Sequence, residues 1–187
     1  MRGISRGPVR VVRRLAARLV ALWHAADHAV RTAGVLWYRT ARATVRRLAR
    51  QNGTTQATAA GVVAALSPRL SWTYNVRAAE ALLGSADHIP GVFRANLAKA
   101  QSIADGARPL TVLSGPKVRA FYRALMGDTS AAVVDVWTAR AAGVNPAGLS
   151  PKLYDQVARA LKLGADEVGT TTSSLQAVAW VSVRGRA

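Results

Sequence analysis

Asp135 is an acidic residue whose surroundings in the sequence suit a carboxylate held out of bulk water. It lies in an apolar run, residues 131–137, and Arg140 follows five positions later. A carboxylate held out of bulk water can stabilise a positive charge that develops in a transition state, and it can activate a water molecule. An aspartate here could also be the N-cap of a helix over residues 135–142. The two roles are compatible, and the residues alone do not separate them.

The composition narrows the classes of partner and reaction. The chain has 187 residues, 26 Lys+Arg against 9 Asp+Glu, a net charge of +17 and 50% hydrophobic residues, enough for a core. This charge indicates a polyanionic partner, either nucleic acid or an anionic membrane surface. The absence of cysteine excludes disulfides, thiolate zinc sites, iron–sulfur clusters and cysteine nucleophiles. No nucleotide- or cofactor-binding motif is present, and we expect neither a cofactor nor a metal.

The apolar pattern is helical along nearly the whole chain, and proline and glycine divide it into short segments. This predicts an all-α, helix-hairpin-helix architecture and suits a long four-helix bundle poorly. Only residues 131–136 could form a short strand. The predicted helices cover residues 9–33, 35–50, 55–66, 71–83, 92–105, 116–126, 135–142, 151–163 and 172–183. Their expected N-caps include Thr54 or Thr55, Ser71, Ser114 and Ser150.

Positive charge is concentrated in the first 50 residues, which carry +11, whereas residues 51–187 carry +6. We therefore expect a basic helical segment, 1–50, followed by a helical domain, 51–187. Residues 9–23 read as an amphipathic helix, and its basic side is formed by Arg10, Arg13, Arg14 and Arg18. The first interpretation is a docked helix whose basic face could also contact DNA and supply sequence-independent affinity. The alternatives are a phosphate-tracking helix and an interfacial or targeting helix.

Four short motifs follow one another along the chain. They are Leu-Ser-Pro-Arg at 66–69, Gly-Val-Phe at 91–93 with Lys-Ala at 99–100, Leu-Ser-Gly-Pro-Lys at 113–117, and Val-Val-Asp-Val-Trp at 133–137. Their order resembles the helix-hairpin-helix DNA glycosylase superfamily, of which endonuclease III is the nearest well-known member. The resemblance covers residues 61–142. The chain also resembles small proteins of bacteriophages that infect actinobacteria, which share a C-terminal Gln-Ala-x-x-Trp and a nearby Arg-Gly, here Gln176 to Trp180 and Arg184-Gly185.

The resemblance implies a DNA N-glycosylase acting on a base flipped out of the duplex. Cleavage of an N-glycosidic bond creates positive charge on the deoxyribose, and the resemblance makes Asp135 the catalytic carboxylate that stabilises it. Arg69 stands where the family has a glutamine that fills the gap left by the extruded base. Four aromatic residues could line the base pocket or belong to the core: Trp72, Tyr74, Tyr122 and Trp137.

The same resemblance implies a set of DNA-binding residues: Ser114, Gly115, Lys117, Arg119 and Arg140. The junction at 113–117 could offer backbone N–H groups to a phosphate, although a Gly-Pro turn is also ordinary loop structure. It departs from the family because Gly-Pro-Lys replaces Gly-Val-Gly and proline removes one donor. Lys117 is the one candidate for a Schiff-base lysine, but the position matching the family's lysine is Arg119, which cannot form one. A monofunctional activity is therefore favoured over a lyase.

Three functions stay open. The first is a glycosylase-like enzyme that excises or modifies a DNA base. The second is a catalytically inactive DNA-binding protein on the same scaffold, favoured by the altered hairpin and by Val136-Trp137 in place of the family's Thr-His. The third, less favoured, is a membrane-surface protein led by residues 9–23. A phage origin would place the protein in the cytoplasm of a bacterial host.

Overall fold

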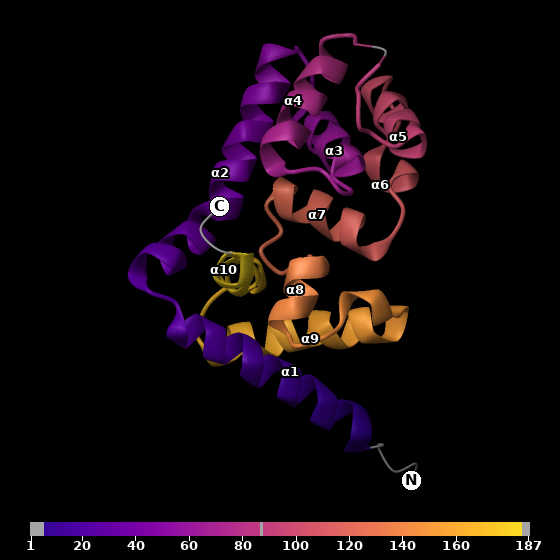
Figure 1. Cartoon of the computed structure of the whole chain (residues 1–187). Coiled ribbons are helices and arrows are strands. Elements are labelled where there is room, and N and C mark those ends of the chain that lie inside the picture. The colour runs from indigo at the N-terminus through magenta and orange to yellow at the C-terminus, as the bar shows by residue number, and fades with distance from the viewer. Residues whose placement is uncertain (1–5, 87, 185–187) are drawn as a thin grey trace. The chain divides into compact units, whose positions relative to one another are not determined.

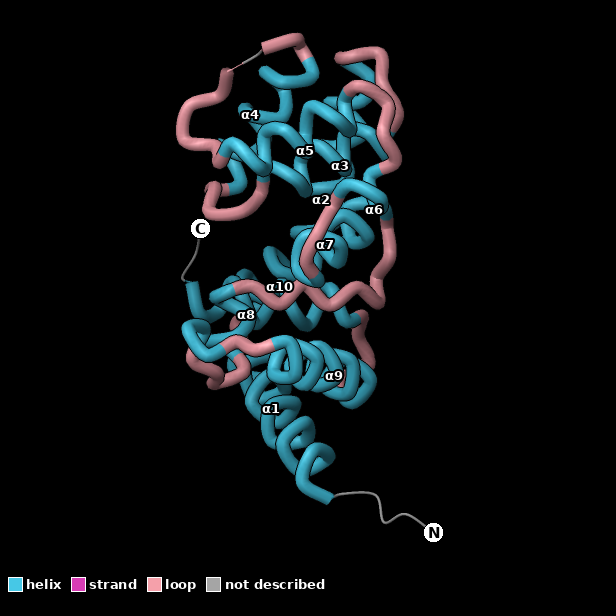
Figure 2. The backbone as a smooth tube through the Cα atoms, turned by 90° about the vertical axis from the view of Figure 1, so that its right-hand side faces the viewer, coloured by secondary structure: helices cyan, strands magenta, loops and turns pink. Residues whose placement is uncertain are grey.

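The computed structural model describes residues 6–86 and 88–184. Within these ranges the chain forms ten α-helices and one short 3-10 helix, joined by loops and without a strand (Figure 2). The predicted all-α class is therefore confirmed. The elements are α1 (Arg6–Ala25), α2 (His28–Gln51), α3 (Gln56–Leu66), α4 (Trp72–Leu83), α5 (Arg94–Ala104), α6 (Pro109–Val112), α7 (Pro116–Met126), α8 (Val136–Ala141), η1 (Pro146–Gly148), α9 (Pro151–Glu167) and α10 (Thr172–Arg184). None of these helices is long and apolar enough to cross a membrane.

The chain divides into two compact units. Unit 1 consists of the residues up to Tyr38 and those from Thr129 onward, and unit 2 consists of Arg39–Asp128. The first boundary falls inside α2. The division expected from the sequence, 1–50 and 51–187, follows the charge, whereas this one follows the contacts. The two differ because α1 packs with the C-terminal helices α9 and α10.

Unit 1 confirms that the amphipathic N-terminal helix is docked. α1 packs against α9, α10 and α8, and α1 and α9 run beside each other in Figure 1. Leu15 and Leu19 of α1 are buried in one core with Val157 and Leu161 of α9 and Leu175 of α10. The arginines predicted for its basic side are exposed: Arg10, Arg13, Arg14 and Arg18. The helix thus contributes apolar surface to the core and leaves a basic face in solvent.

Unit 2 is organised around α3. This helix contains no charged residue, and every residue from Ala59 to Leu66 is buried. A helix that is apolar on all sides belongs in the centre of a fold, and α3 packs against α4, α5, α6 and α7. Gly61 permits the close approach, because a Cβ there would lie 2.9 Å from Ile103 and 2.8 Å from Pro109.

The predicted helix break at Gly34 is wrong. Gly34 lies inside α2, and the chain turns instead between α1 and α2, where Asp27 Oδ1 accepts a hydrogen bond of 2.8 Å from the Val30 N–H. The Arg31 guanidinium donates to the Trp23 carbonyl at 3.1 Å and so satisfies a carbonyl at the end of α1. Gly34 is required for another reason, because a Cβ there would lie 2.5 Å from Val178 Cγ2 in α10.

Two further local predictions are wrong. Residues 131–135 form an irregular segment and not a strand, since the described chain offers no second strand with which to pair. Ser114 is not the N-cap of α7; that position is Gly115, which makes no side-chain cap bond. Three predicted N-caps are confirmed by hydrogen bonds from their side chains: Thr55, Ser71 and Ser150. The remaining predicted helices match α3, α4, α5, α7, α8, α9 and α10 to within four residues at each end.

Candidate functional site

Asp135 lies in unit 1, where a largely buried segment passes into α8. Its backbone is extended (φ −102°, ψ −175°), and its Oδ1 accepts a hydrogen bond of 2.7 Å from the backbone N–H of Thr138. The predicted N-cap is therefore confirmed. The side chain is half-buried, and no hydrogen bond to Oδ2 occurs in the described part of the chain. One carboxylate oxygen is anchored, and the other is open to a water molecule or a substrate.

The short helix that Asp135 caps carries an aromatic ring and a positive charge. Val136, the next residue, is 48% exposed. Trp137 is half-buried, and the guanidinium carbon of Arg140 lies 4.6 Å from the centroid of its ring. Such a cation–π pair holds both side chains in place at the surface. The short helix α8 and its N-cap therefore bring a carboxylate, an indole and a guanidinium into one stretch of sequence, residues 135–140.

Two tyrosines lie on the buried side of this carboxylate. The Tyr154 hydroxyl donates to the Ala132 carbonyl at 3.2 Å and accepts a longer bond of 3.4 Å from the Val134 N–H. Burial raises the pKa of Tyr154; the hydrogen bond from the Val134 N–H lowers it by less, and the negative charge of Asp135 raises it by less still. Burial, and then the Asp135 charge, also raise the pKa of Tyr38. Both phenols therefore stay protonated at neutral pH.

A chain of hydrogen bonds connects Tyr38 to the segment that carries Asp135. The Tyr38 hydroxyl donates to Gln176 Oε1 at 2.9 Å, and Gln176 Nε2 donates to the Thr138 hydroxyl at 3.0 Å. That hydroxyl donates in turn to the Val133 carbonyl at 3.2 Å. All three side chains are buried. Polar groups buried in this way are hydrogen-bonded to avoid a desolvation cost, and here they bond to one another.

Sequence reasoning missed Tyr38, Thr138 and Tyr154 as neighbours of Asp135. Gln176 belongs to the Gln-Ala-x-x-Trp motif, and a lone amide within the apolar face of a helix was a signal for a buried polar contact. Of that motif's neighbours, Arg184 stacks on Trp180 at 5.0 Å, and Gly185 lies outside the described residues. No comparable sequence signal marks Tyr38, which is 97 positions before Asp135.

The predicted site residues are divided between the two units. Unit 1 holds Asp135, Trp137 and Arg140, and unit 2 holds the rest. In unit 2, Arg69 is exposed and has a positive φ of 67°. That left-handed conformation is strained for a non-glycine residue and is concentrated at functional turns. Its guanidinium carbon lies 5.6 Å from the centroid of Phe93, which is 49% exposed at the start of α5.

The hairpin residues make contacts within unit 2. Ser114 Oγ accepts a hydrogen bond of 2.6 Å from Lys99 Nζ of α5. Arg119 is exposed, and its guanidinium donates to the Leu110 and Leu113 carbonyls at 2.8 and 3.2 Å, joining α6 to α7. Gly115 has a φ of 80°, a conformation that glycine adopts readily. Lys117 is half-buried at the start of α7.

The three predicted pocket aromatics of unit 2 mostly serve packing. Trp72 makes an edge contact with the buried Phe121, with ring centroids 6.5 Å apart. Tyr122 is buried, and burial raises its pKa. Tyr74 is half-buried and donates a short hydrogen bond to the Pro90 carbonyl. The alternative interpretation of these residues as core therefore fits Trp72 and Tyr122 best.

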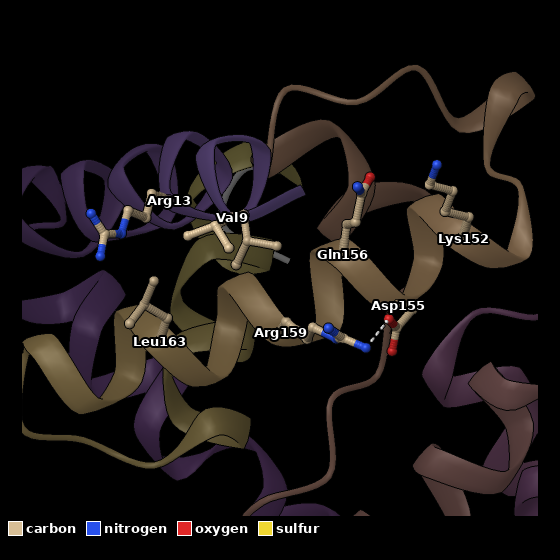
Figure 3. A pocket seen from close by; sticks show the side chains of 8 residues that line it. Val9, Arg13, Lys152, Asp155, Gln156, Arg159 and Leu163 are labelled. Carbon is tan, nitrogen blue, oxygen red and sulfur yellow. Dashed lines mark ion pairs between the residues drawn. The ribbon is translucent and has the colours of Figure 1, made fainter. Parts of the chain in front are cut away.

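A groove of about 490 Å³ lies between α1 and α9 in unit 1 (Figure 3). Its apolar part is Val9, Val12 and Leu163, and Arg159 is paired with Asp155 at 2.9 Å. The Arg13 and Lys152 side chains lie at opposite ends of the view in Figure 3.

Among known proteins, the chain matches a family that has no assigned activity. No curated protein and no solved structure matches the chain. Residues 6–187 match a family described as "Family of unknown function (DUF7178)". The glycosylase resemblance therefore stays a prediction. Since the match extends over almost the whole chain, the protein belongs to this DUF7178 family.

Proposed function

We propose that the protein binds DNA and hydrolyses the N-glycosidic bond of an extruded base, with Asp135 as the catalytic carboxylate. The observation that carries this proposal is the environment of Asp135. One of its oxygens is anchored by the Thr138 N–H, the other makes no hydrogen bond within the described residues, and the Trp137–Arg140 cation–π pair belongs to the helix that Asp135 caps. In this proposal α6, residues 113–115 and α7 form the hairpin of a helix-hairpin-helix fold.

The chemistry needs few groups. The bond between C1′ and the base nitrogen breaks, and its electron pair leaves with the base. The oxygen of a water molecule forms a new bond to C1′, and the proton that it loses passes to the Asp135 carboxylate and then, through solvent, to the base. The ionised carboxylate also stabilises the positive charge on the deoxyribose. The indole of Trp137 offers a face on which a flipped base could stack.

The remaining features of the proposal concern DNA affinity. Net charge of +17 favours a polyanionic partner, and the exposed arginines of α1 form a face for phosphate contacts. In unit 2, the Arg69–Phe93 pair offers a stacking group beside a strained turn, which suits a side chain that fills the gap left by a flipped base. Arg119 and Ser114 support the hairpin through internal hydrogen bonds, so their contribution to DNA binding would be positioning of the hairpin backbone.

One experiment tests the catalytic step. DNA from phage and host is incubated with the protein, and free bases and nucleosides are measured by mass spectrometry. We expect release of a base by the wild type and about a hundredfold less by Asp135→Asn, since asparagine keeps the cap but removes the charge. The matched control is Asp166→Asn, an exposed aspartate of α9, which should behave as wild type. Equal release by wild type and Asp135→Asn would contradict the proposal, and an altered nucleoside without free base would indicate base modification.

A catalytically inactive DNA-binding protein is the second candidate. The observation favouring it is that the cap bond to Thr138 already accounts for an aspartate at position 135. In that case DNA binds, but neither free base nor altered nucleoside is found. For both candidates the logarithm of DNA affinity falls with the logarithm of salt concentration, by about 0.9 per phosphate contacted. Affinity that does not depend on salt would contradict both.

A further inference from the structure

Gln176 is an amide in the interior of unit 1 whose two polar atoms are both used. It is 4% exposed, accepts from the Tyr38 hydroxyl and donates to the Thr138 hydroxyl. Thr138 cannot also donate to Gln176 Nε2, so its own proton goes to the Val133 carbonyl at 3.2 Å. Each donor therefore has one acceptor, and the chain has a single direction from Tyr38 to Val133. A reversed amide could donate to the Tyr38 oxygen and accept from the Thr138 hydroxyl, but the single Thr138 proton would then leave the Val133 carbonyl and the Tyr38 proton would lose its acceptor. The orientation of Gln176 in the structure is therefore the one that keeps all three hydrogen bonds.

Thr138 connects this chain to Asp135. Its side chain holds the Val133 carbonyl, and its backbone N–H holds Asp135 Oδ1 at 2.7 Å. Both bonds close the same turn, residues 133–138, with Asp135 in the middle. These hydrogen bonds thereby link the irregular segment to Gln176 of α10 and to Tyr38 of α2. Both residues belong to unit 1. A loop residue gains a rigid position when helices hold its neighbours in this way.

We infer that Gln176 and Tyr38 are positioning residues that hold the Asp135 carboxylate in place through Thr138. The inference rests on the proposed function, since it gives a role in catalysis to residues that do not touch the substrate. Loss of these hydrogen bonds lets the turn at residues 133–138 move while the Asp135 carboxylate stays in the protein. A displacement of about 1 Å at a reacting group can lower a rate by roughly a hundredfold. We therefore expect Gln176→Leu to lower kcat by about 10- to 100-fold and to change the Kd for DNA by less than about twofold.

Two substitutions of Thr138 separate the effect of its hydroxyl from the effect of its shape. Thr138→Val removes the hydroxyl and keeps the shape, whereas Thr138→Ser keeps the hydroxyl. We expect the valine variant to match Gln176→Leu and the serine variant to recover most of the wild-type kcat. Tyr38→Phe deletes a single oxygen, and it replaces Gln176→Leu as the test variant if Gln176→Leu does not fold. The control is Ser182→Ala, which removes a side-chain bond to the Val178 carbonyl elsewhere in α10 and should leave kcat unchanged.

A second readout separates this inference from the proposed function. Hydrogen exchange is measured at the Thr138 amide, which caps onto Asp135, and at the Leu153 amide, which is capped by Ser150 in the same unit. In Gln176→Leu we expect the Thr138 amide to exchange about tenfold faster relative to the Leu153 amide. An unchanged ratio would overturn the inference, whatever the activity. If the ratio changes but the wild type neither releases nor alters any base, the proposed function fails while the positioning of Asp135 stands.

Discussion

Gly34→Ala is the substitution for which the structure yields the clearest magnitude. A Cβ at this position would lie 2.5 Å from Val178 Cγ2, 2.6 Å from Val178 Cα and 2.7 Å from its nitrogen. Two of these atoms belong to the backbone of α10, so they cannot rotate away as a side-chain end could. Gly34 is also four residues before Tyr38, and therefore on the same face of α2. The close contact brings Tyr38 within hydrogen-bond distance of Gln176.

Two opposing terms set the expected change in stability. Alanine in place of glycine inside a helix stabilises by about 0.5–1 kcal/mol. Overpacking a close contact destabilises by about 1–3 kcal/mol, and contact with backbone favours the upper half of that range. The net expectation is a loss of about 1–2 kcal/mol. For a chain of 150–250 residues, that lowers Tm by about 2–8 °C.

Urea and thermal unfolding, followed by circular dichroism at pH 7, measure the effect. The matched control is Ala33→Gly at the neighbouring exposed position of α2, which reports the helix-propensity term alone. We expect Ala33→Gly to destabilise by about 1 kcal/mol. If Gly34→Ala were instead more stable than the wild type by the same amount, α2 and α10 would not be in close contact, and the reasoning would be refuted.

The pKa of Tyr38 is raised in the folded state by burial and by Asp135, so stability should be full below about pH 10, where a tyrosine of the unfolded chain ionises, and fall above it. Urea unfolding at pH 9 and 11 should show this fall, and Tyr38→Phe should make it smaller; an equal fall in both would contradict the assignment. Asp135→Ala should cost about 1 kcal/mol in unfolding free energy through the lost cap, whereas Asp135→Asn should cost only a few tenths; equal losses in both variants would contradict the cap. Arg14→Gln, on the exposed face of α1, should weaken DNA binding for all sequences and lower the salt slope by about 1, with no change in Tm; an unchanged slope would exclude a phosphate contact there.

Local structure was largely predictable from the sequence, because it depends on neighbours along the chain. The all-α class, most helices, the caps at Thr55, Ser71 and Ser150, and the amphipathic face of α1 all follow from short-range patterns. The N-cap at Asp135 was also predictable, since an aspartate before a short helix can accept from an N–H three residues later.

Predictions from the sequence failed where the role of a residue depends on a segment that is distant along the chain. Gly34 looks like a helix break in sequence, and only the position of Val178 in α10 reveals that it permits a close contact. Residues 131–136 have the composition of a strand, but no second strand is available in the described chain. The division of the chain into units follows from the docking of α1 on α9, which the distribution of charge does not report.

The sequence by itself determined the helices, the basic character of the chain and the cap at Asp135, because periodicity, charge and cap chemistry are local properties. The candidacy of Asp135 for catalysis came from the family resemblance. Only the tertiary structure decided what surrounds that carboxylate. Tyr38, Thr138 and Gln176 lie in three different helices, and they meet because buried polar groups must find partners when those helices pack. Such a constraint acts through space and leaves no fixed spacing along the chain.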